Sequence, residues 1–319
     1  MIQKEILKKI KEFERIIITM HMRPDGDCTG AAFGLKDILK TSFPQKEIYV
    51  VGEEAEYVKF LGRVDEVSDE KFSDALIIAV DTATSDRIAD QRFKLGKYLI
   101  KIDHHLPVED YGMINYVDTT ACAASQIIFS FYNMFKKKLK ISPNGLAALY
   151  TGIVTDSGRF KYRSVSGDTF RSIASMVDMG LDFAPILEKL DVKTEEMLKL
   201  KGYVLFSYEK TPNGVAYIKI TPEILAKYNV SLEEATSLVN ELSVIEDSPV
   251  WALFAEYDGN FVRGRLRSRG PAINELANKY NGGGHAMACG VSLETWDNVN
   301  KLLEDADLLV KEYKINKGL

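Results

Sequence analysis

Short apolar runs alternate with segments of helical periodicity in the first part of the chain. Residues 15–20, 46–51, 75–80 and 97–102 are apolar runs of strand length, and 28–40 carries apolar residues at helical spacing. Continuous apolar runs are typical of strands that are covered on both faces of a parallel sheet. The alternation predicts an α/β domain that opens with a strand, a helix and a second strand.

The middle of the chain predicts mainly helices. Residues 121–135 and 143–155 keep helical spacing, 166–209 reads as several further helices, and 112–117 has the pattern of one more strand. Residues 53–74 are charged and short-patterned, so a helix and a loop are expected there. The first domain is therefore expected to be a mainly parallel sheet flanked by helices.

A second, strand-rich pattern begins after residue 213. Strands are predicted at 214–220, 250–258 and 261–270, and a helix is predicted to follow at 271–280. Gly259-Asn260 is a hairpin signal between the last two strands. The fold class is therefore α/β throughout, with a second, smaller α/β domain.

Length and composition support two domains in a globular protein. With 319 residues, 46% of them hydrophobic, we expect domains at 1–190 and 213–319 and a helical connector at 191–212. No apolar run approaches the roughly 20 residues that span a bilayer, so a cytoplasmic location without membrane contact is expected. The formal net charge of -5 argues against binding of long nucleic acid. The three cysteines include no C-x-x-C pair and are expected to be reduced.

Candidate chemistry begins at the end of the first predicted strand. His21, Asp25 and Asp27 follow it in a turn that also contains Pro24 and Gly26. An imidazole with two carboxylates is a compact set of metal ligands. The alternative is a structural turn in which Asp27 caps the following helix, and for this stretch alone that alternative is favoured.

Ionisable residues also follow two other predicted strands. Asp81 ends the third strand, and Asp103, His104 and His105 end the fourth. Ligands bind outside the carboxyl ends of strands in open α/β sheets, so these groups are expected to converge. Asp also starts turns, which explains one such strand end more readily than three. Asp156 follows a predicted helix, where capping of the next segment is its alternative role.

Four carboxylates and two imidazoles exceed what one tetrahedral zinc site uses. They suit two divalent ions that share a bridging carboxylate, an arrangement that activates water and stabilises both oxygens of an in-line displacement. The oxygen-rich donor set with imidazole favours two Mn²⁺ over Mg²⁺, Co²⁺ or Fe²⁺. Hydrolysis of a phosphate ester is the predicted reaction. The candidate ligands are His21, Asp25, Asp27, Asp81, Asp156 and one histidine of the 104–105 pair.

The second domain carries a candidate anion site. The period of two in the predicted strand at 261–270 places four arginines on one face, Arg263, Arg265, Arg267 and Arg269. A phosphate-binding face is favoured over an edge strand that is protected from aggregation by charge. The glycines at 282–284 allow backbone amides to approach a ligand beside His285, although such a run also ends helices.

These motifs, in this order, resemble the DHH/DHHA1 phosphoesterase superfamily over nearly the whole chain. Within it, the compact two-domain form is similar to bacterial nanoRNases and 3′-phosphoadenosine 5′-phosphate (pAp) phosphatases, a group that includes phosphodiesterases acting on pApA and cyclic di-AMP. The motifs are His21-x-x-Pro24-Asp25-Gly26-Asp27, Asp81-Thr82-Ala83, Asp103-His104-His105, Thr155-Asp156-Ser157-Gly158 and Gly282-Gly283-Gly284-His285.

The resemblance implies a role for each candidate residue. One ion is held by His21, Asp25 and Asp81. The other ion is held by Asp27, Asp81, His104 and Asp156. His105 acts near the scissile phosphate, with Asp103 orienting the histidine pair. Substrate is bound by Arg267, Ser268, Gly283, Gly284 and His285, and by Arg265, which stands where the family has Ser.

The resemblance also implies the activity and its partners. The chain is expected to hydrolyse pApA and other nanoRNA, bound in the cleft between the domains, with pAp and cyclic di-AMP as further candidate substrates. The order among these substrates and the oligomeric state, a homodimer included, stay open. Inorganic pyrophosphatase is an alternative, although the second domain has no lysine-rich phosphate-binding run. A non-catalytic nucleotide sensor is another, which the complete ligand set disfavours.

Overall fold

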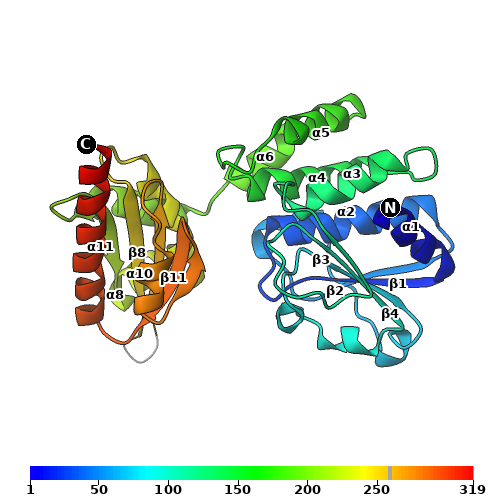
Figure 1. The fold of residues 1–319 in the computed structure, drawn as a ribbon, viewed down its shortest axis with the longest axis horizontal. Coiled ribbons are helices and arrows are strands. Elements are labelled where there is room, and N and C mark those ends of the chain that lie inside the picture. The colour runs from blue at the N-terminus through cyan, green and yellow to red at the C-terminus, as the bar shows by residue number, and fades with distance from the viewer. Residues whose placement is uncertain (258–260, 319) are drawn as a thin grey trace. The chain divides into compact units, whose positions relative to one another are not determined.

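The computed structural model describes residues 1–257 and 261–318. The chain divides into two compact units, Met1–Val192 and Lys193–Leu319, each with its own sheet and core (Figure 1). Both units are built of helices and strands, so the α/β fold class expected from the sequence is confirmed. The hairpin turn expected at Gly259-Asn260 lies outside the described residues.

The first unit is built on a five-stranded sheet in which all strands are parallel. The strand order is β2 (Glu47–Val51), β1 (Arg15–Thr19), β3 (Leu76–Val80), β4 (Tyr98–Asp103) and β5 (Ile114–Val117). These strands match the apolar runs of the sequence. β3 is buried along its whole length, as expected for a strand that is covered on both faces.

Helices cover one face of this sheet, with α2, α3 and α4 side by side above it in Figure 1. Their apolar residues share one core with Ile16 and Ile18 of β1. Pro143 begins α4 because its missing N–H is not needed in the first turn of a helix. The helices of this unit are α1 (Ile2–Glu12), α2 (Gly26–Ser42), α3 (Ala124–Met134), α4 (Pro143–Asp156), α5 (Gly167–Asp178) and α6 (Ala184–Asp191).

Short 3₁₀ helices and loops cover the opposite face. Ile17 and Ile77 point into a smaller core there, which Phe72 and Phe93 close. The helix and loop expected at 53–74 are short 3₁₀ helices joined by loop, not an α-helix. This charged segment offers no continuous apolar stripe, and it forms only η1 (Glu56–Leu61) and η2 (Asp69–Lys71), in which the single buried residue is Val58. The other 3₁₀ helices of this unit are η3 (Ser85–Arg87) and η4 (Gln91–Leu95).

The second unit has a six-stranded mixed sheet. Only β7 and β8 pair in parallel, and the other neighbours are antiparallel. The strand order is β10 (Gly283–His285), β11 (Ala288–Leu293), β9 (Phe261–Ser268), β8 (Val250–Tyr257), β7 (Val215–Ile220) and β6 (Glu209–Lys210).

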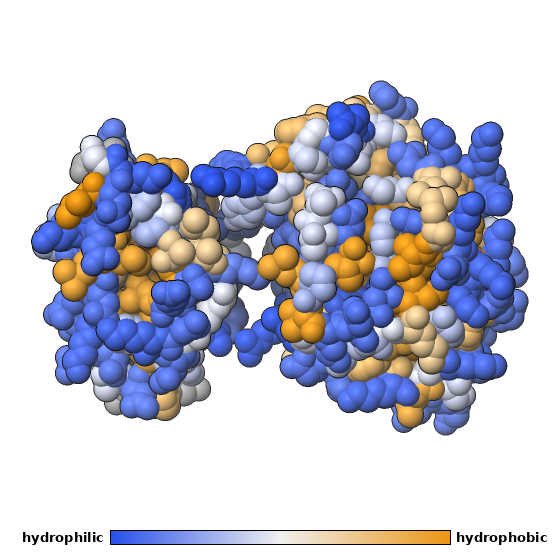
Figure 2. All heavy atoms as spheres, in the orientation of Figure 1, coloured by the Kyte–Doolittle hydropathy of each residue, from blue (hydrophilic) through white to orange (hydrophobic). Residues whose placement is uncertain are grey.

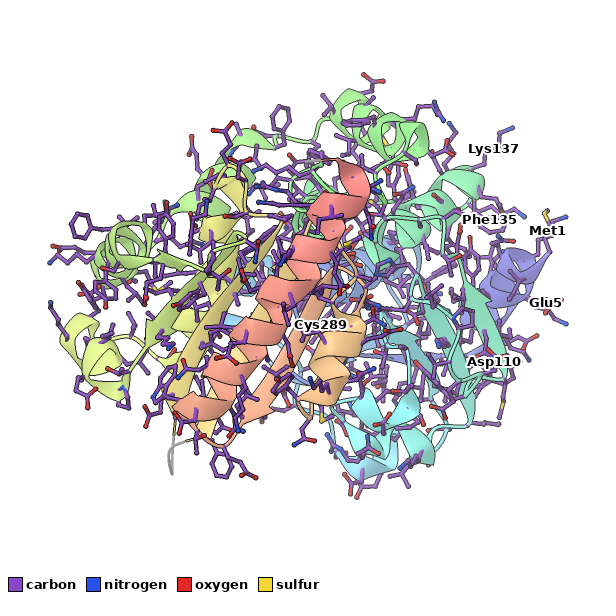
Figure 3. The ribbon with its side chains drawn as sticks, turned by 60° about the vertical axis from the view of Figure 1, so that its left-hand side comes forward. Met1, Glu5, Asp110, Phe135, Lys137 and Cys289 are labelled. Carbon is purple, nitrogen blue, oxygen red and sulfur yellow. The ribbon has the colours of Figure 1, made fainter. Side chains whose placement is uncertain are left out.

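Helices cover both faces of this second sheet. α10 (Asn274–Lys279) and α11 (Trp296–Lys317) pack on one face over a core that includes Cys289 (Figure 3). The other face packs against α7 (Glu195–Ser207), α8 (Pro222–Tyr228), α9 (Leu232–Ser237) and η5 (Leu238–Val244). The segment expected to be a connector, 191–212, therefore contributes α7 to the core of the second unit.

Hydrophilic side chains occupy most of the visible face of both units (Figure 2). Among the described residues, no helix combines the length and the apolar character needed to cross a bilayer. The three cysteines, Cys28, Cys122 and Cys289, are buried free thiols, in agreement with the reduced state expected from the sequence.

Candidate metal centre and substrate groups

The strand order places the candidate ligands at a switch point of the first sheet. From β1 the chain passes to β2 on one side and then to β3 on the other, so the connections leave a crevice at the carboxyl ends of β1 and β3. His21 follows β1 and Asp81 follows β3, and the two side chains approach to 3.7 Å, from Nε2 to Oδ2. The convergence of strand ends predicted from the sequence is confirmed.

His21 is buried and held by its own loop. Its ring nitrogen Nδ1 lies 3.0 Å from the carbonyl oxygen of Met22. A carbonyl only accepts, so Nδ1 carries the proton and Nε2 is left as a lone-pair donor toward the carboxylates. Nε2 also lies 3.9 Å from Oδ1 of Asp25. The histidine is therefore in the tautomer that a metal ligand requires.

Asp25 and Asp27 take different positions at the start of α2. Asp25 is the N-cap, and its Oδ1 accepts from the backbone N–H groups of Asp27 and Cys28, both at 3.0 Å. The capping role that was the alternative for Asp27 thus belongs to Asp25. Asp27 is buried and accepts from the first N–H groups of α3, Ala124 at 2.6 Å and Ser125 at 2.9 Å. Partial positive charge at a helix N-terminus stabilises this carboxylate.

Glycine allows the close approach of α4 to this carboxylate. A Cβ atom on Gly152 would lie 1.9 Å from Oγ of Ser125 and 2.7 Å from Oδ1 of Asp27, which no side chain tolerates. The N–H groups of Ala124 and Ser125 and this glycine are functional features that the sequence did not reveal. The only sequence signal was the predicted start of a buried helix near residue 121.

Asp81 is strained and incompletely satisfied. Its φ is +52°, a left-handed backbone conformation that costs free energy in a residue other than glycine. Its carboxylate is 2% exposed, and Oδ1 has no hydrogen-bond partner among the described residues. An unsatisfied buried carboxylate oxygen is costly, so this position suits a positively charged ligand.

His104 stands among three carboxylates. Its Nε2 lies 3.3 Å from Oδ1 of Asp81, 3.4 Å from Oδ2 of Asp156 and 3.8 Å from Oδ2 of Asp27. These groups come from β3, β4, α2 and the end of α4. Asp156 therefore lies beside the other candidate ligands. The sequence predicted a ligand role for Asp156 only because those other ligands were present.

His105 points to a different partner. Its Nδ1 lies 2.8 Å from Oδ1 of Asp103, which also accepts from the backbone N–H groups of His104 and His105. An N–H donor at Nδ1 leaves Nε2 of His105 as the free ring nitrogen. Asp103 is fully buried, and its Oδ1 contacts the backbone of both histidines and the ring of His105.

The pKa values record an excess of buried negative charge. Burial raises the pKa of Asp27 well above its usual range, and the charges of Asp81 and Asp156 add to this effect. Burial, with Asp81 and Asp25, also raises the pKa of Asp156 to about 6, against the opposing charge of His104. Burial opposes ionisation of Asp81 too, but the nearby imidazoles of His104 and His21 lower its pKa to about 2. The close contact with Asp81 and the charge of Asp27 outweigh burial and raise the pKa of His104 to about 10.

These residues fit divalent cations. Carboxylate oxygens and imidazole nitrogens are the donors that such ions take in hydrolases, and the orphaned Oδ1 of Asp81 faces His104. Among the described residues, three sets of side chains could each hold an ion, because the donor atoms within each set lie within 4.8 Å of one another. Asp81 belongs to two of these sets. The sets are Asp27 with His104 and Asp156, Asp81 with His104 and His105, and His21 with Cys28 and Asp81.

Cys28 is the one member of these sets that was not among the candidate site residues predicted from the sequence. Its Sγ accepts from the backbone N–H of His21 at 3.4 Å and lies 3.8 Å from the carbonyl oxygen of Val80. The thiol therefore sits between the ends of β1 and β3, beneath the carboxylates. Nothing in the spacing of the motif distinguished it from an apolar residue at the start of a buried helix.

In the second unit, β9 presents alternate residues to opposite faces. Arg263, Arg265 and Arg267 are partly buried on one face, between buried residues that point to the other. Arg265 is paired across the sheet with Gly290 of β11, and no ion pair or hydrogen bond of its guanidinium occurs among the described residues. Burial, with the like charges of Arg267 and Arg263, lowers the pKa of Arg265. An anion beside it relieves both effects.

The expectation that Arg269 shares this strand face is wrong. β9 ends at Ser268, and the guanidinium of Arg269 donates to the carbonyl oxygens of Ser243, Ile245 and Ser248, which binds it to the η5 segment. Ser268 is buried and its hydroxyl donates to the carbonyl oxygen of Pro271 at 2.6 Å. Both side chains are therefore engaged inside the second unit.

The glycine run forms the edge hairpin of the same sheet. Gly283 pairs with Gly290, and Gly284, at a φ of +139°, pairs with Cys289. A Cβ on Gly284 would lie 2.4 Å from the carbonyl oxygen of Ala288, so only glycine fits there. His285 is exposed at the end of β10. β11, the strand next to Arg265, thus offers the bare backbone of Gly290 beside a guanidinium, and the glycines of β10 lie one strand further out.

Comparison with known families agrees with this arrangement. The N-terminal domain of the DHH family matches residues 15–153, and the DHHA1 domain matches residues 213–312. The Streptococcus mutans protein named "Probable bifunctional oligoribonuclease and PAP phosphatase NrnA" is 40% identical over 91% of this chain and 93% of its own length. The chain belongs to the DHH family of phosphoesterases.

Two further relatives cover nearly the whole of this DHH phosphoesterase. The Bacillus subtilis "Bifunctional oligoribonuclease and PAP phosphatase NrnA" is 35% identical over 97% of the chain and 99% of its own length. A crystal structure of an exopolyphosphatase-related protein from Bacteroides fragilis has a TM-score of 0.87 at 26% identity, with 97% of each chain covered. The enzyme class and the two-domain architecture expected from the sequence are thus confirmed. The family is metal-dependent, in agreement with the donor sets above.

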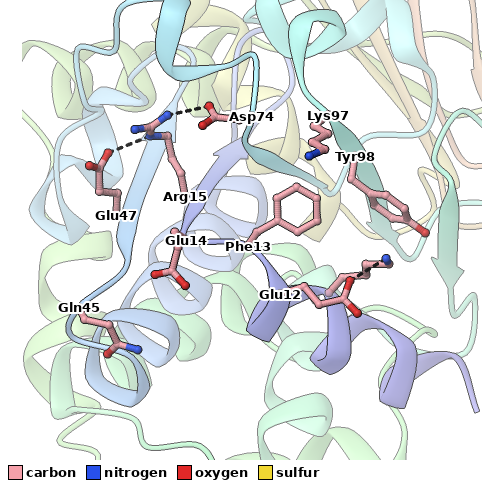
Figure 4. A pocket seen from close by; sticks show the side chains of 10 residues that line it. Glu12, Phe13, Glu14, Arg15, Gln45, Glu47, Asp74, Lys97 and Tyr98 are labelled. Atoms are coloured by element: carbon pink, nitrogen blue, oxygen red, sulfur yellow. Dashed lines mark hydrogen bonds and ion pairs between the residues drawn. The ribbon is translucent and has the colours of Figure 1, made fainter.

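A pocket of about 630 Å³ lies at the opposite end of β1 (Figure 4). Most of its charged groups are paired. Arg15 donates to Glu47 and Asp74, and Lys9 donates to Glu12. The pocket of this DHH protein therefore has cations beside its carboxylates, unlike the carboxylate cluster.

Proposed function

We propose that this enzyme is a manganese-dependent phosphodiesterase that releases 5′-mononucleotides from very short oligoribonucleotides such as pApA. Dephosphorylation of pAp to AMP is part of the same proposal, and cyclic di-AMP is a further candidate substrate. The names of the Streptococcus mutans and Bacillus subtilis relatives support oligonucleotide and pAp hydrolysis.

The observation that carries the proposal is the position of His104. One imidazole nitrogen lies within 3.8 Å of carboxylate oxygens from Asp27, Asp81 and Asp156, three residues that come from different parts of the chain. Surplus negative charge of this kind is stable only beside cations. The donor set suits two divalent ions that bind phosphate oxygens in their open positions.

The ligands divide into two groups that share Asp81. His21, Asp25 and Asp81 hold the first ion in this proposal. Asp27, Asp81, His104 and Asp156 hold the second. When bound, the two Mn²⁺ ions activate water and neutralise the charge that develops on the phosphoryl oxygens. The N–H groups at the start of α3 would hold the Asp27 carboxylate in place for the second ion.

The remaining groups act on the substrate itself. His105, oriented by Asp103, presents its free ring nitrogen for transfer of a proton near the scissile phosphate. Arg265 and Arg267 bind further phosphate groups of the nucleotide, as guanidinium forks suit phosphate oxygens. Gly283, Gly284 and His285 contribute backbone and side-chain donors, and Ser268 fixes the turn at Pro271 behind them.

One kinetic panel tests the proposal. Purified enzyme with Mn²⁺ is incubated with pApA, pAp, cyclic di-AMP, inorganic pyrophosphate and a long single strand, and the release of AMP or phosphate is followed by chromatography. We expect AMP from pApA and pAp, with little degradation of the long strand. Faster turnover of pyrophosphate than of any nucleotide refutes the proposal in favour of a pyrophosphatase. Tight binding of pApA without hydrolysis refutes it in favour of a sensor.

The ligand assignment has its own test in a pair of variants. Asp156→Ala removes one donor of the second ion, whereas Asp168→Ala removes an exposed carboxylate of α5 whose partner is Arg171. We expect the Asp156 variant to keep its fold by circular dichroism, to bind about one Mn²⁺ per chain fewer and to lose nearly all turnover. The Asp168 variant should match the wild type. Full activity of Asp156→Ala contradicts the assignment.

A further inference from the structure

Lys101 is a fully buried lysine in the middle of the first sheet. It lies on β4, two residues before Asp103, and has 0% exposure. A buried ammonium group costs free energy unless its donors and its charge are satisfied. An apolar side chain fills the interior of a parallel sheet without that cost. The lysine therefore has to be explained by what its ammonium group contacts.

Those contacts join the segments that carry the candidate ligands. Nζ donates to the carbonyl oxygen of Ala83 at 2.7 Å and to that of Glu109 at 3.1 Å. Ala83 lies two residues after Asp81. Nζ also lies 3.4 Å from Oδ2 of Asp103, an ion pair between two side chains of 0% exposure.

The ring of Tyr111 covers the ammonium group of Lys101. Nζ lies 5.0 Å from the centre of the Tyr111 ring, and the Tyr111 hydroxyl donates to the carbonyl oxygen of Thr82 at 2.8 Å. Glu109 is fixed in turn, because its carboxylate accepts from the backbone N–H and the hydroxyl of Ser85. The loops after β3 and β4 are thus tied to each other around one ammonium group.

Charge explains why this position holds a lysine. Asp103 accepts three hydrogen bonds on Oδ1, from the backbone of His104 and His105 and from the His105 ring, while Oδ2 has no hydrogen bond. The nearby ammonium is the group that compensates Oδ2. Without it, this carboxylate retains an unpaired buried oxygen and turns toward other donors.

We propose that Lys101 is a positioning residue of the active site. It fixes the carboxylate of Asp103, and through it the ring of His105, and it fixes the backbone that follows Asp81. The kinetic consequence of this inference rests on the proposed function, because the action of His105 on the substrate is part of that proposal. Its structural consequence, the orientation of the His105 ring, does not depend on any activity.

The test compares two buried lysines. Lys101→Met removes the ammonium at nearly constant volume. Lys46→Met is the matched control, since Lys46 is also buried and donates to two carbonyl oxygens, those of Lys11 and Phe13, at the opposite end of the sheet. Lys101→Gln keeps an N–H donor without the charge and replaces the methionine variant if that protein does not fold.

Nitrogen-15 labelling of the four histidines gives a readout that needs no turnover. In the wild type, the Nδ1–H signal of His105, assigned with a His105→Gln variant, should show the downfield shift of a proton bonded to a carboxylate. We expect Lys101→Met to lose or shift that signal and Lys46→Met to retain it. With pApA, kcat of the Lys101 variant should fall about 10- to 100-fold with a smaller change in KM.

Two results overturn the inference. One is an unchanged His105 signal with wild-type kcat in the Lys101 variant. The other is an equal loss of both in Lys46→Met, which assigns the effect to general destabilisation. Failure of the proposed function is recognised separately, because the wild type then hydrolyses none of the nucleotides while the histidine spectra still decide the role of Lys101.

Discussion

Binding of Mn²⁺ should be coupled to the release of protons from the carboxylate cluster. Without metal, the pKa of His104 is about 10, because its close contact with Asp81 and the charge of Asp27 outweigh burial. The pKa of Asp156 is about 6, raised chiefly by burial. A metal ligand must be deprotonated, so protons compete with the ion at both positions. The sign follows directly: the apparent affinity for Mn²⁺ rises with pH.

The two pKa values set the size of the effect. Between about pH 6 and pH 10, His104 has to lose one proton, so the apparent affinity should rise about tenfold per pH unit, or about 1.4 kcal/mol. Below about pH 6, Asp156 adds a second proton and the slope steepens. Asp27, whose pKa burial also raises, adds to the same trend. His104 and Asp156 interact strongly, so the protons belong to the cluster as a whole.

Calorimetric titration with Mn²⁺ in buffers of different ionisation enthalpy counts the released protons. We expect at least one proton per bound pair of ions at pH 8 and a larger number at pH 5.5. Asp156→Asn removes one titrating carboxylate and should flatten the dependence below pH 6 while leaving the slope at pH 8. An affinity that does not change between pH 8 and pH 7, or a proton count of zero at pH 8, refutes the charge balance derived for the cluster.

Three other experiments test the two units separately. Gly152→Ala places a Cβ against Ser125 and Asp27, so we expect about 1–3 kcal/mol of destabilisation in denaturant unfolding and weaker Mn²⁺ binding. The control is Gly202→Ala in α7, where the Cβ meets open space and should stabilise the protein by up to about 1 kcal/mol. Mn²⁺ at 100 times its Kd should stabilise the first unit by about 2.7 kcal/mol, seen as a rise in Tm that chelation reverses. Arg269→Met removes a donor from three carbonyl oxygens, so a loss of about 1 kcal/mol is expected in thermal unfolding, with unchanged kcat and KM for pApA. Unchanged stability of Gly152→Ala, a Tm that ignores Mn²⁺, or a raised KM of the Arg269 variant contradicts the corresponding assignment.

The sequence predicted the first sheet and the convergence of its ligands for one physical reason. Fully buried parallel strands are continuous apolar runs, so their ends are visible where the first ionisable residues appear, at His21, Asp81 and Asp103. Short carboxylate and imidazole side chains at neighbouring strand ends have to meet. By contrast, the helix type at 53–74 could not be predicted, because 3₁₀ turns leave no periodic apolar stripe.

Hydrogen bonds between side chains and backbone groups could not be predicted from the sequence. Asp27 is held by N–H groups of Ala124 and Ser125, which every residue type except proline provides. Lys101 reads as one polar residue within an apolar run, and only the fold shows that its ammonium reaches two carbonyl oxygens and Asp103. The predicted strand face of Arg269 was wrong for a related reason, because period-two alternation does not show where a strand ends.

The two units should therefore differ in how substitutions near their functional side chains affect activity. A proposed ligand such as Asp27 or Asp81 has a short side chain, so its oxygen is placed by the backbone beneath it, and a shift of that backbone moves the oxygen by the same amount. The carboxylate cluster is accordingly surrounded by fixed features, the N-terminus of α3, the left-handed backbone of Asp81 and the buried ammonium of Lys101. Arg265 has a long side chain opposite Gly290 of β11, so in the proposed function its guanidinium can reach different phosphate positions. Substitutions near Arg265 should consequently change the choice of nucleotide, whereas substitutions around Asp81 should remove turnover of every substrate.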